Sequence, residues 1–402
     1  MKIIYLLINR FSERDYKRFG FELLEKKGHD VEAWDCVDLL YPNLHGLGVN
    51  PNMPSFERNL KIFKNSSQLN DSIGRLSVNT LIVLLGTLNQ NGFIHIIKKL
   101  NERKIKYGIV YLANLPNIQV SYLLKIFLYF KTPKILIDKI KSRLKTKDTI
   151  NSTTEINPEF ILYSGNVIKE KIDKIFSETK TKISVPSLDY DYYCEEDNHL
   201  EEKGSNYAVF VDEDNLDHPD IIYHNSKSNV NGRFYLNELN KYFEKFEHKT
   251  NLKILIAGHP KANYEKKENI FKGRDIIMNR TKELIKNSKA VLVHCSTSVS
   301  FAILARKPII FLTSNKYTGE YQYLIEIMSR ELGQRPTDIS INNYDIRIPK
   351  LNLNFYKKYE LNYLNNAKLN GNYSSIWETF NKYINSYSID EDNEKRKITS
   401  DN

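Results

Sequence analysis

Short apolar runs alternate with segments of helical periodicity along the first 165 residues. Residues 2–8 form an unbroken apolar run, which is typical of a parallel strand buried on both faces. From Ser12 to Lys27 the apolar positions share one helical side, and Ser12 and Gly28 suit the two caps. Further predicted elements are strands at His29–Trp34, Asn79–Leu85, Tyr107–Leu112 and Glu159–Tyr163, and a helix at Gly92–Arg103. Such alternation predicts a parallel α/β sheet.

A second alternating series begins at Tyr207, after an acidic stretch (192–205) without an apolar run. Its predicted strands are 207–211, 252–257, 290–293 and 308–312, and its predicted helices are 234–246, 281–287, 298–305, 321–330 and 376–384. We therefore expect two Rossmann-like domains, an N-terminal one over 1–195 and a C-terminal one over 205–345. A helical segment over 346–388 and a charged, disordered tail over 389–402 would follow.

Composition supports a folded protein with two cores. The chain has 402 residues, of which 41% are hydrophobic and 27% charged. Its net charge of +10 comes mainly from dispersed lysines. No zinc-finger spacing, RNP-like strand or arginine cluster is present, so we predict no nucleic-acid partner. The charge suits phosphorylated small molecules or anionic lipid, and equally a plain solvated surface.

Cysteine usage and hydropathy favour the cytoplasm. Cys36, Cys194 and Cys295 are far apart and form neither a disulfide framework nor a CxxC metal site. The N-terminal apolar run stops at Asn9-Arg10 with no small-residue cleavage site after it, so it predicts a strand rather than a signal peptide. No apolar stretch approaches the roughly 20 residues of a membrane span.

The segment from Val120 to Lys147 is unusual because aromatic and apolar residues are followed by a strongly basic stretch. A basic amphipathic segment of this kind can lie on an anionic membrane surface. The alternative is an ordinary pair of helices, divided at Pro133, with the apolar face in the core and the lysines in water.

A Gly-His-Pro-Lys sequence follows the strand 252–257. Gly258 would let the backbone turn, and Pro260 would fix φ, so that His259 is held at the carboxyl edge of the sheet. There its imidazole could donate to a phosphate oxygen, and Lys261 adds positive charge. The alternative is a surface or capping histidine.

Hydroxyl residues follow the strand 290–293 and lead directly into a helix. Ser296, Thr297, Ser298 and Ser300 are more hydroxyls than one N-cap needs. Free N–H groups and the helix dipole at such a start favour an anion. The turn therefore predicts a phosphate or pyrophosphate site, with a plain N-cap as the alternative.

Carboxylates cluster after the strand 207–211, at Asp212-Glu213-Asp214 and again within 217–220. Mutual repulsion raises the pKa of clustered carboxyls toward a range useful to a general base, and their oxygens could also hold a metal. A solvated acidic loop is the alternative. We take Asp212 and Glu213 as candidate catalytic residues and predict no metal.

Two loops of the first half are candidates for an acceptor site. Arg10, Ser12 and Arg14 lie in the loop that links the first strand to the first helix. Gly86 and Thr87 follow the strand 79–85. Ligands in open α/β sheets bind beyond the carboxyl ends of strands, where both loops would lie.

The segment Leu252–Leu312 resembles the donor-binding domain of GT-B glycosyltransferases, in the order strand, His-Pro, helix, strand, Ser/Thr turn, helix, Lys-Pro, strand. In sialyltransferases and Kdo transferases of this fold, the His of an HP motif and a Ser/Thr motif bind the cytidine phosphate. His259-Pro260 and Ser296-Thr297-Ser298 match those motifs. The acidic motif that supplies the base in those families lies in the N-terminal domain, unlike Asp212-Glu213-Asp214. The stretch Arg14–Asp35 more loosely resembles bacterial surface-carbohydrate biosynthesis proteins.

The resemblance implies two parallel sheets facing a central cleft and an inverting transfer from a nucleotide-sugar to a surface glycan or lipid-linked acceptor, as in capsule or lipopolysaccharide biosynthesis. Many UDP- and ADP-sugar transferases carry a ribose-binding Glu in the helix after the turn, and Val299–Ala305 has none. This favours a CMP-activated acidic sugar, such as Kdo or a nonulosonic acid. We predict no cofactor. The enzyme would be cytoplasmic and peripheral at the inner membrane face. Alternatives are a nucleotide-sugar 2-epimerase, a pyruvyl transferase or a non-catalytic module of a glycan-assembly complex.

Overall fold

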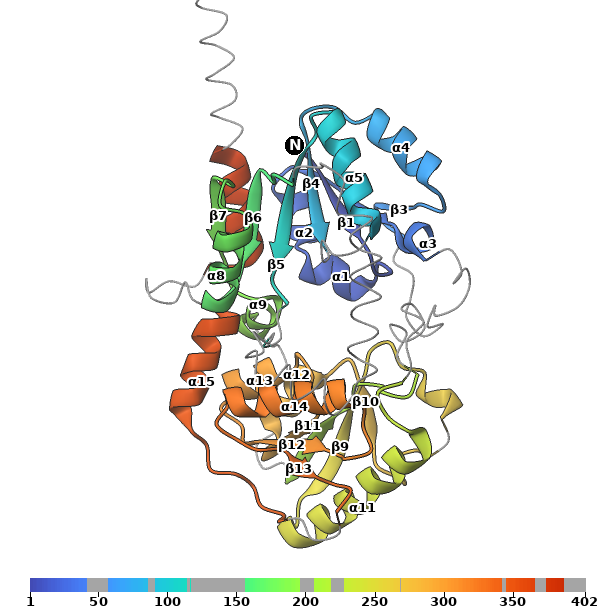
Figure 1. Ribbon diagram of the computed structural model, residues 1–402, viewed down its shortest axis with the longest axis vertical. Helices are drawn as coiled ribbons and strands as arrows, with labels where there is room; N and C mark the ends of the chain where they lie inside the picture. The colour runs from blue at the N-terminus through green and yellow to red at the C-terminus, as the bar shows by residue number, and fades with distance from the viewer. Residues whose placement is uncertain are drawn as a thin grey trace, which may run out of the picture.

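The computed structural model describes residues 1–41, 57–85, 91–113, 116, 156–195, 206–217, 228–267, 269–341, 345–365 and 374–386. These residues form two α/β domains, each built on a parallel sheet (Figure 1). The fold class predicted from the sequence, two Rossmann-like domains, is confirmed. Segment 120–147, Gly86, Thr87, residues 218–220 and residues 389–402 lie outside the described part of the chain.

In its described residues, the first domain has a seven-stranded sheet in the order β3-β2-β1-β4-β5-β6-β7. Its strands are β1 Lys2–Leu7, β2 Asp30–Asp35, β3 Leu60–Ile62, β4 Thr80–Leu85, β5 Lys106–Tyr111, β6 Phe160–Tyr163 and β7 Thr181–Ser184. Its helices are α1 Glu13–Arg18, α2 Phe21–Lys26, α3 Val37–Leu40, α4 Ser66–Gly74, α5 Asn91–Glu102, α8 Asn166–Ile175 and α9 Leu188–Cys194. The sequence pattern missed β3 and β7, which are short edge strands with no buried apolar run.

The described part of the second domain has a six-stranded sheet in the order β10-β9-β8-β11-β12-β13. Its strands are β8 Tyr207–Val211, β9 Lys253–Gly258, β10 Ile276–Met278, β11 Ala290–Val293, β12 Ile309–Thr313 and β13 Thr337–Asp338. Its helices are α11 Gly232–Thr250, α12 Thr281–Asn287, α13 Val299–Leu304 and α14 Gly319–Glu331, with a 3₁₀ turn η2 at Tyr264–Lys266. The helix α15 Leu353–Tyr359 and the π-helical turn η3 Glu360–Leu364 follow.

Both sheets reverse their strand order beside their first strand. In the first domain β1 pairs with β2 on one side and β4 on the other, and in the second domain β8 lies between β9 and β11 in the same way. In open α/β sheets this reversal opens a crevice at the carboxyl ends of the two diverging strands. On topology alone, a ligand would be expected between β1 and β4 in the first sheet or between β8 and β11 in the second.

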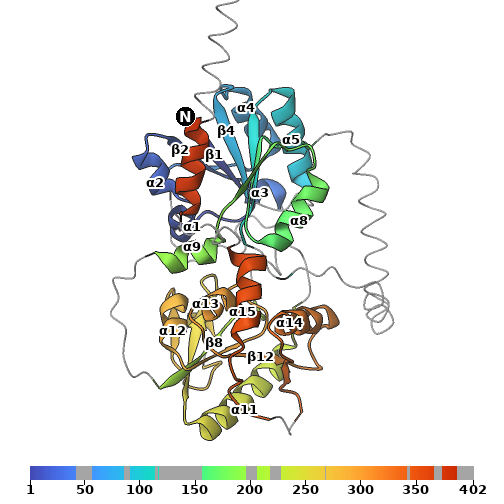
Figure 2. The same ribbon diagram turned by 90° about the vertical axis from the view of Figure 1, so that its left-hand side faces the viewer.

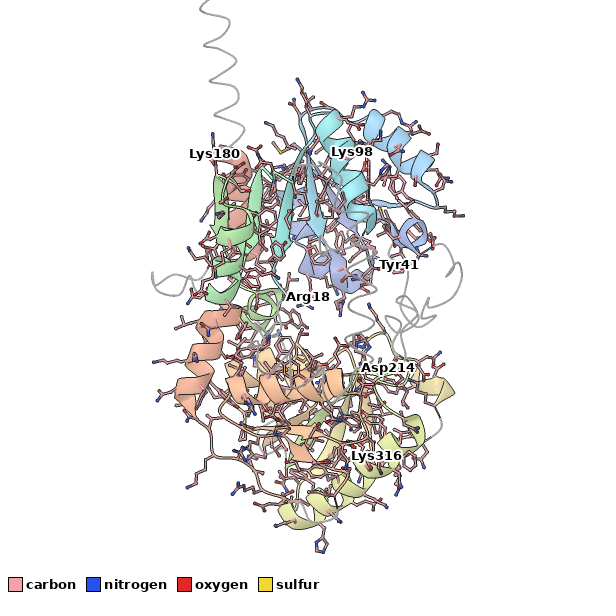
Figure 3. All side chains as sticks on the ribbon, viewed as in Figure 1. Arg18, Tyr41, Lys98, Lys180, Asp214 and Lys316 are labelled. Atoms are coloured by element: carbon pink, nitrogen blue, oxygen red, sulfur yellow. The ribbon has the colours of Figure 1, made fainter. Side chains whose placement is uncertain are left out.

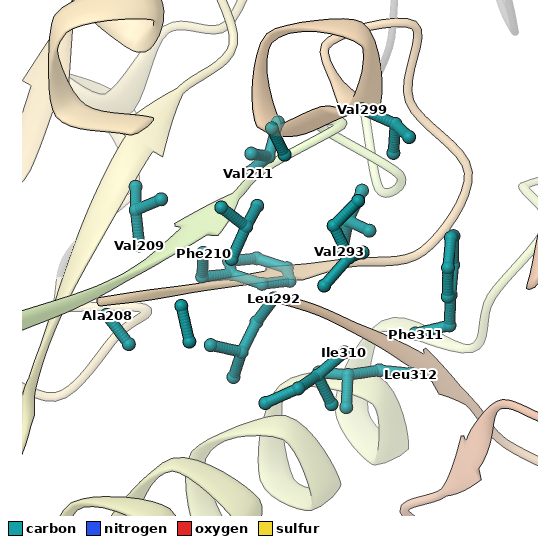
Figure 4. Packing of buried hydrophobic residues seen from close by; sticks show 14 of the residues in the cluster. Ala208, Val209, Phe210, Val211, Leu292, Val293, Val299, Ile310, Phe311 and Leu312 are labelled. Carbon is teal, nitrogen blue, oxygen red and sulfur yellow. The ribbon is translucent and has the colours of Figure 1, made fainter. Parts of the chain in front are cut away.

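The cores explain why the apolar runs form strands. Side chains of β8, β11 and β12 are almost fully buried, and Figure 4 shows them packed on both faces of the second sheet with Val299 of α13 above. Strands buried on both faces need continuous apolar sequence, which is the pattern that the chain shows there.

The single helix predicted from Ser12 to Lys27 is two helices, α1 and α2, so that prediction is wrong. The chain breaks at Gly20, which has a φ of 67° in the left-handed region. A Cβ at Gly20 would lie 2.2 Å from Cγ of Trp377, so the indole occupies the space that a side chain would need. Ser12 caps α1 as predicted, because its side chain accepts from the N–H of Asp15. The break depends on a residue that lies more than 350 positions away, which local periodicity does not reveal.

The C-terminal part of the chain returns to the first domain. Ile376, Trp377 and Phe380, from the helix over 376–386, belong to the first domain's core together with Tyr5. Figure 2 shows α9 and α15 between the two domains. The N–H of Ser187 donates to the carbonyl of Leu364 at 2.6 Å. These segments join the domains.

Candidate functional site

The predicted donor residues meet at the carboxyl edge of the second sheet. Asp212 and Glu213 follow β8, His259 follows the neighbouring β9, and Ser296 follows β11 on the other side. Figure 3 shows Asp214 at the end of the second domain nearest the first domain. Because adjacent strands lie about 4.8 Å apart, the ends of β9 and β11 are separated by roughly 10 Å across the end of β8.

Asp212 is a buried carboxylate whose oxygens are both engaged. It is 5% exposed, and its Oδ2 accepts from the hydroxyl of Tyr264 at 2.5 Å. Its Oδ1 accepts from the N–H of Asp214 at 3.3 Å. Burial raises the pKa of Asp212 to about 6, and the charge of Asp214 adds to the increase. Asp212 therefore holds neighbouring groups and faces away from solvent.

The Glu213 side chain reaches from the end of β8 to the turn after β11 and to α14. Its Oε1 accepts from the N–H of Cys295 at 2.6 Å, and its Oε2 accepts from the hydroxyl of Tyr321 at 3.0 Å. Burial raises the pKa of Glu213 to about 7, and these two hydrogen bonds oppose the increase. The side chain is half-buried, so it can exchange a proton near neutral pH.

Asp214 differs from its two neighbours because it has a cation. Lys267 forms an ion pair with Asp214 and also reaches Asp217 at 3.1 Å. Asp214 is 4% exposed and adopts a φ of 49°, so the chain turns sharply at this point. The acidic cluster thus divides into one neutralised carboxylate and two with raised pKa values.

His259 is held by its own backbone and by Tyr264. Its N–H donates to the hydroxyl of Tyr264 at 2.7 Å, and its Nδ1 accepts from the N–H of Lys261 at 3.3 Å. In the neutral imidazole the proton is then on Nε2, which leaves that nitrogen as the donor. Pro260 follows directly and fixes its own φ.

The role expected for Gly258 needs correction. Gly258 is the last residue of β9 and is absent from the positive-φ positions, so it does not supply a special turn conformation. A Cβ there would lie 2.4 Å from Sδ of Met278 and 2.9 Å from Cε2 of Tyr264. Glycine fits here because the side chains of Met278 and Tyr264 both pack against the strand end.

The hydroxyl turn is not a simple helix cap. Ser298 is the N-cap of α13 but makes no capping hydrogen bond with its side chain. Ser296 Oγ accepts from the N–H of Ser298 at 3.2 Å. Thr297 is exposed, and Ser296 and Ser298 are half-buried. The hydroxyl of Ser296 therefore caps the turn that leads into α13, whereas that of Ser298 does not.

Behind this turn lies an aromatic cage that sequence inspection did not identify as part of the site. His294 is fully buried, its Nδ1 lies 2.8 Å from the carbonyl of Leu312, and its Nε2 lies 3.2 Å from the hydroxyl of Tyr235. Burial lowers its pKa to about 4, so the ring is neutral at physiological pH. The rings of Tyr317 and Tyr321 pack against it. These contacts fix His294, the residue immediately before Cys295.

Arg10, Ser12 and Arg14 lie in the first domain. Arg10 forms ion pairs with Asp35, at 3.4 Å, and with Asp38. The hydroxyl of Ser12 is buried and donates to Asp15 at 2.7 Å. Arg14 is 45% exposed in its side chain, 3.4 Å from Asp15. All three of these predicted acceptor residues thus have structural partners in the first domain.

Other features do not coincide with this edge. A cavity of about 560 Å³ lies at the amino ends of β1 and β4, lined by Lys2, Trp34, Lys61 and Thr80 among others. Within the described residues, no three His, Cys, Asp or Glu side chains converge on a position that could hold a metal ion. Among those same residues, no helix is long and apolar enough to span a bilayer.

No family model and no curated protein matches the chain. Among solved structures, the UDP-GlcNAc 2-epimerase of Methanocaldococcus jannaschii in complex with UDP-GlcNAc and UDP is 14% identical, with a TM-score of 0.46 over 89% of this chain and 98% of that one. Phytolacca americana UGT2, complexed with UDP-2fluoro-glucose and pterostilbene, is 9% identical, with a TM-score of 0.43 over 89% of each chain. The spinosyn forosaminyltransferase SpnP is 12% identical, with a TM-score of 0.41 over 90% and 91%. Similarity at this level assigns no activity to this chain.

Proposed function

We propose that the chain binds a nucleotide-sugar at the carboxyl edge of the second sheet and transfers its sugar to an acceptor. The observation that carries this proposal is the grouping of His259, Glu213 and the Ser296–Ser298 turn at the carboxyl ends of β9, β8 and β11, next to the point where the strand order reverses. This is the position where the topology of an open α/β sheet provides a ligand site.

The donor's phosphates would bind on the His259 and Ser296 sides of the crevice. The turn after β8 is acidic and would repel a phosphate, whereas His259 offers an Nε2 donor and Lys261 follows it. Donors at this edge would stabilise the negative charge that develops on the leaving phosphate. Ser296, Thr297 and Ser298 would supply hydroxyls from the opposite side.

Glu213 is the better of the two candidate general bases. Its raised pKa and partial exposure suit it to accept a proton from an acceptor hydroxyl near neutral pH. Asp212 is buried behind Tyr264 and would act by positioning. The acceptor would approach from the first domain, where the loop of Arg10, Ser12 and Arg14 is located.

For the donor class we propose a CMP-activated acidic sugar. The support is the absence of a carboxylate from α13, whose sequence is VSFAIL, together with the net charge of +10. The acceptor would be a surface glycan or a lipid-linked sugar, and segment 120–147 would bring the enzyme to an anionic membrane.

A thermal-shift panel with CMP, CDP, UDP and GDP tests donor binding. A nucleotide at about 100 times its Kd should add about 2.7 kcal/mol to the free energy of unfolding. We expect CMP to give the largest shift, and His259→Ala to lose it. His248→Ala is the matched control, because His248 is exposed near the end of α11. A shift with UDP or GDP alone would overturn the donor class, and no shift with any nucleotide would favour a non-catalytic module.

An epimerase remains the second candidate, because two carboxyls with pKa values of about 6 and 7 could also move a proton on the sugar itself. The bound nucleotide-sugar should be incubated without any acceptor and the sugar analysed by NMR. Formation of an epimer would establish this function and overturn the transferase. Release of nucleotide only when an acceptor is present would support transfer.

A further inference from the structure

Tyr264 occupies a central place among the donor-site residues, and neither the sequence pattern nor the proposed chemistry uses it. Its hydroxyl lies between two groups from neighbouring strand ends: it accepts from the N–H of His259 at 2.7 Å and donates to Oδ2 of Asp212 at 2.5 Å. A phenol has one hydroxyl proton, and Tyr264 donates it in the hydrogen bond to Asp212. The direction of both hydrogen bonds is therefore fixed.

The phenol stays protonated under all ordinary conditions. Burial, followed by the charge of Asp212, raises the pKa of Tyr264 well above its usual value. Its ring is also held from two sides, since it packs on Gly258 and Lys267 lies 5.8 Å from its centroid. Lys267 is in turn paired with Asp214. The tyrosine is consequently a rigid link between the turn after β8 and the turn after β9.

This link reaches the backbone of the loop that carries the imidazole of His259. The carbonyl of His259 accepts from the N–H of Ala262 at 3.0 Å, and its Nδ1 accepts from Lys261. The tight turn fixes the ring relative to its own loop, and Tyr264 fixes that loop relative to Asp212 and β8. Without the hydroxyl, the N–H of His259 would lose its acceptor and the loop its anchor on β8.

We propose that Tyr264 is a positioning residue that, anchored by Asp212, holds His259 in the orientation and tautomer needed to donate from Nε2 to the phosphate of a nucleotide. The proposal rests on the proposed function for its ligand, but its effect on the imidazole is independent of any ligand. Asp212 then contributes as the anchor of Tyr264 and not as a proton acceptor for substrate.

The test compares Tyr264→Phe with Tyr207→Phe in the full chain. Tyr207 is at the other end of β8, about 16 Å from Asp212 along the strand at about 3.3 Å per residue. Its hydroxyl donates to the carbonyl of Leu284 at 3.0 Å. Each variant removes one hydroxyl from the same domain, with two hydrogen bonds lost in Tyr264→Phe and one in Tyr207→Phe. The ¹⁵N resonances of labelled histidine, with His259 identified by their loss in His259→Ala, report the tautomer and pKa of the imidazole without ligand.

We expect Tyr264→Phe to shift the His259 resonances and to weaken CMP binding about tenfold, the effect of losing one hydrogen bond to a positioned group. Tyr207→Phe should change neither. Asp212→Ala, which removes the anchor and keeps the phenol, should shift the same His259 resonances, so the result does not depend on one variant.

Unchanged His259 resonances in folded Tyr264→Phe would overturn the proposal. If wild type binds none of the nucleotides, the proposed function fails, and the ligand-free histidine resonances still decide whether Tyr264 positions His259. If the resonances shift but CMP affinity is unchanged in Tyr264→Phe, the role in nucleotide binding is refuted.

Discussion

The two domains share a strand order around their first strand but differ in the charges at its carboxyl end. In the first domain Arg10 bridges Asp35 and Asp38, so buried carboxylates have a cation. In the second domain the hydrogen-bond donors on Asp212 and Glu213 are phenols and backbone N–H groups. Burial raises the pKa of Asp35 too, but the N–H of Val37 and the Arg10 charge oppose it, and among the described residues the carboxyls shifted to about 6 and 7 lie in the second domain.

This contrast shows that topology alone does not make a site. Both sheets reverse their strand order at the same topological position, yet Arg10 pairs with the carboxylates at the first edge, whereas the second edge has carboxyls with pKa values of about 6 and 7. Groups with strongly shifted pKa values cluster where a protein performs chemistry. The raised pKa values of Asp212 and Glu213 are therefore our reason for placing the proposed site at the second edge.

The largest effect that we predict is from Arg10→Ala. Removing the cation leaves the Asp35 carboxylate, which is 1% exposed, buried without an opposite charge. The free energy of unfolding should fall by about 3 kcal/mol, measured by urea denaturation at neutral pH. Arg14→Ala is the control, and its loss should stay below about 0.5 kcal/mol because the Arg14 side chain is 45% exposed and Asp15 keeps the hydroxyl of Ser12 as a donor. Equal losses in the two variants would contradict a structural role for the Arg10 cluster.

At the second edge we expect a substitution to raise the free energy of unfolding instead of lowering it. Glu213→Gln removes a charge that burial disfavours and should stabilise the protein at pH 8, by on the order of 1–2 kcal/mol. The same substitution should remove transfer activity if Glu213 is the base. Destabilisation at pH 8 would show that the two edges do not differ as described.

The dependence on pH sharpens this prediction. The pKa of Glu213 in the folded state is raised from 4.5 to about 7, so the folded state binds its proton more tightly than the unfolded state does. Its contribution to stability is thus present below about pH 4.5 and is lost as the pH rises through about 7. The gain from Glu213→Gln should therefore be small at pH 5 and grow toward pH 8. His294, whose pKa is lowered, acts equally in both proteins and cancels from the difference.

Much of this edge was predictable from sequence, and the limits have physical causes. Buried parallel strands require continuous apolar runs, so β8 and β11 were located to the residue and β9 to within one residue at each end. Tyr264 and Tyr321 were missed because a tyrosine in a loop or on a helix carries no local signal of what its hydroxyl contacts. Gly20 was missed as a helix break because Trp377 approaches it from the other end of the chain.

The smallest expected effect sets the baseline for the comparison. Lys17 pairs with Glu13 on the surface of α1, and both side chains are more than half exposed. Lys17→Ala should change the free energy of unfolding by less than about 0.5 kcal/mol, because solvent screens such pairs. A larger loss, measured with the same urea titration, would mean that effects of this size cannot be assigned to buried charge.

Calorimetric titration of CMP into wild type, His259→Ala and Arg14→Ala tests the central claim most directly. If the phosphate binds at the carboxyl edge of the second sheet, His259→Ala should raise the Kd at least about tenfold, the effect of losing a hydrogen bond to a charged group. Arg14→Ala, in the first domain, should leave the Kd unchanged. A raised Kd in Arg14→Ala with an unchanged Kd in His259→Ala would contradict the account and place the phosphate in the first domain.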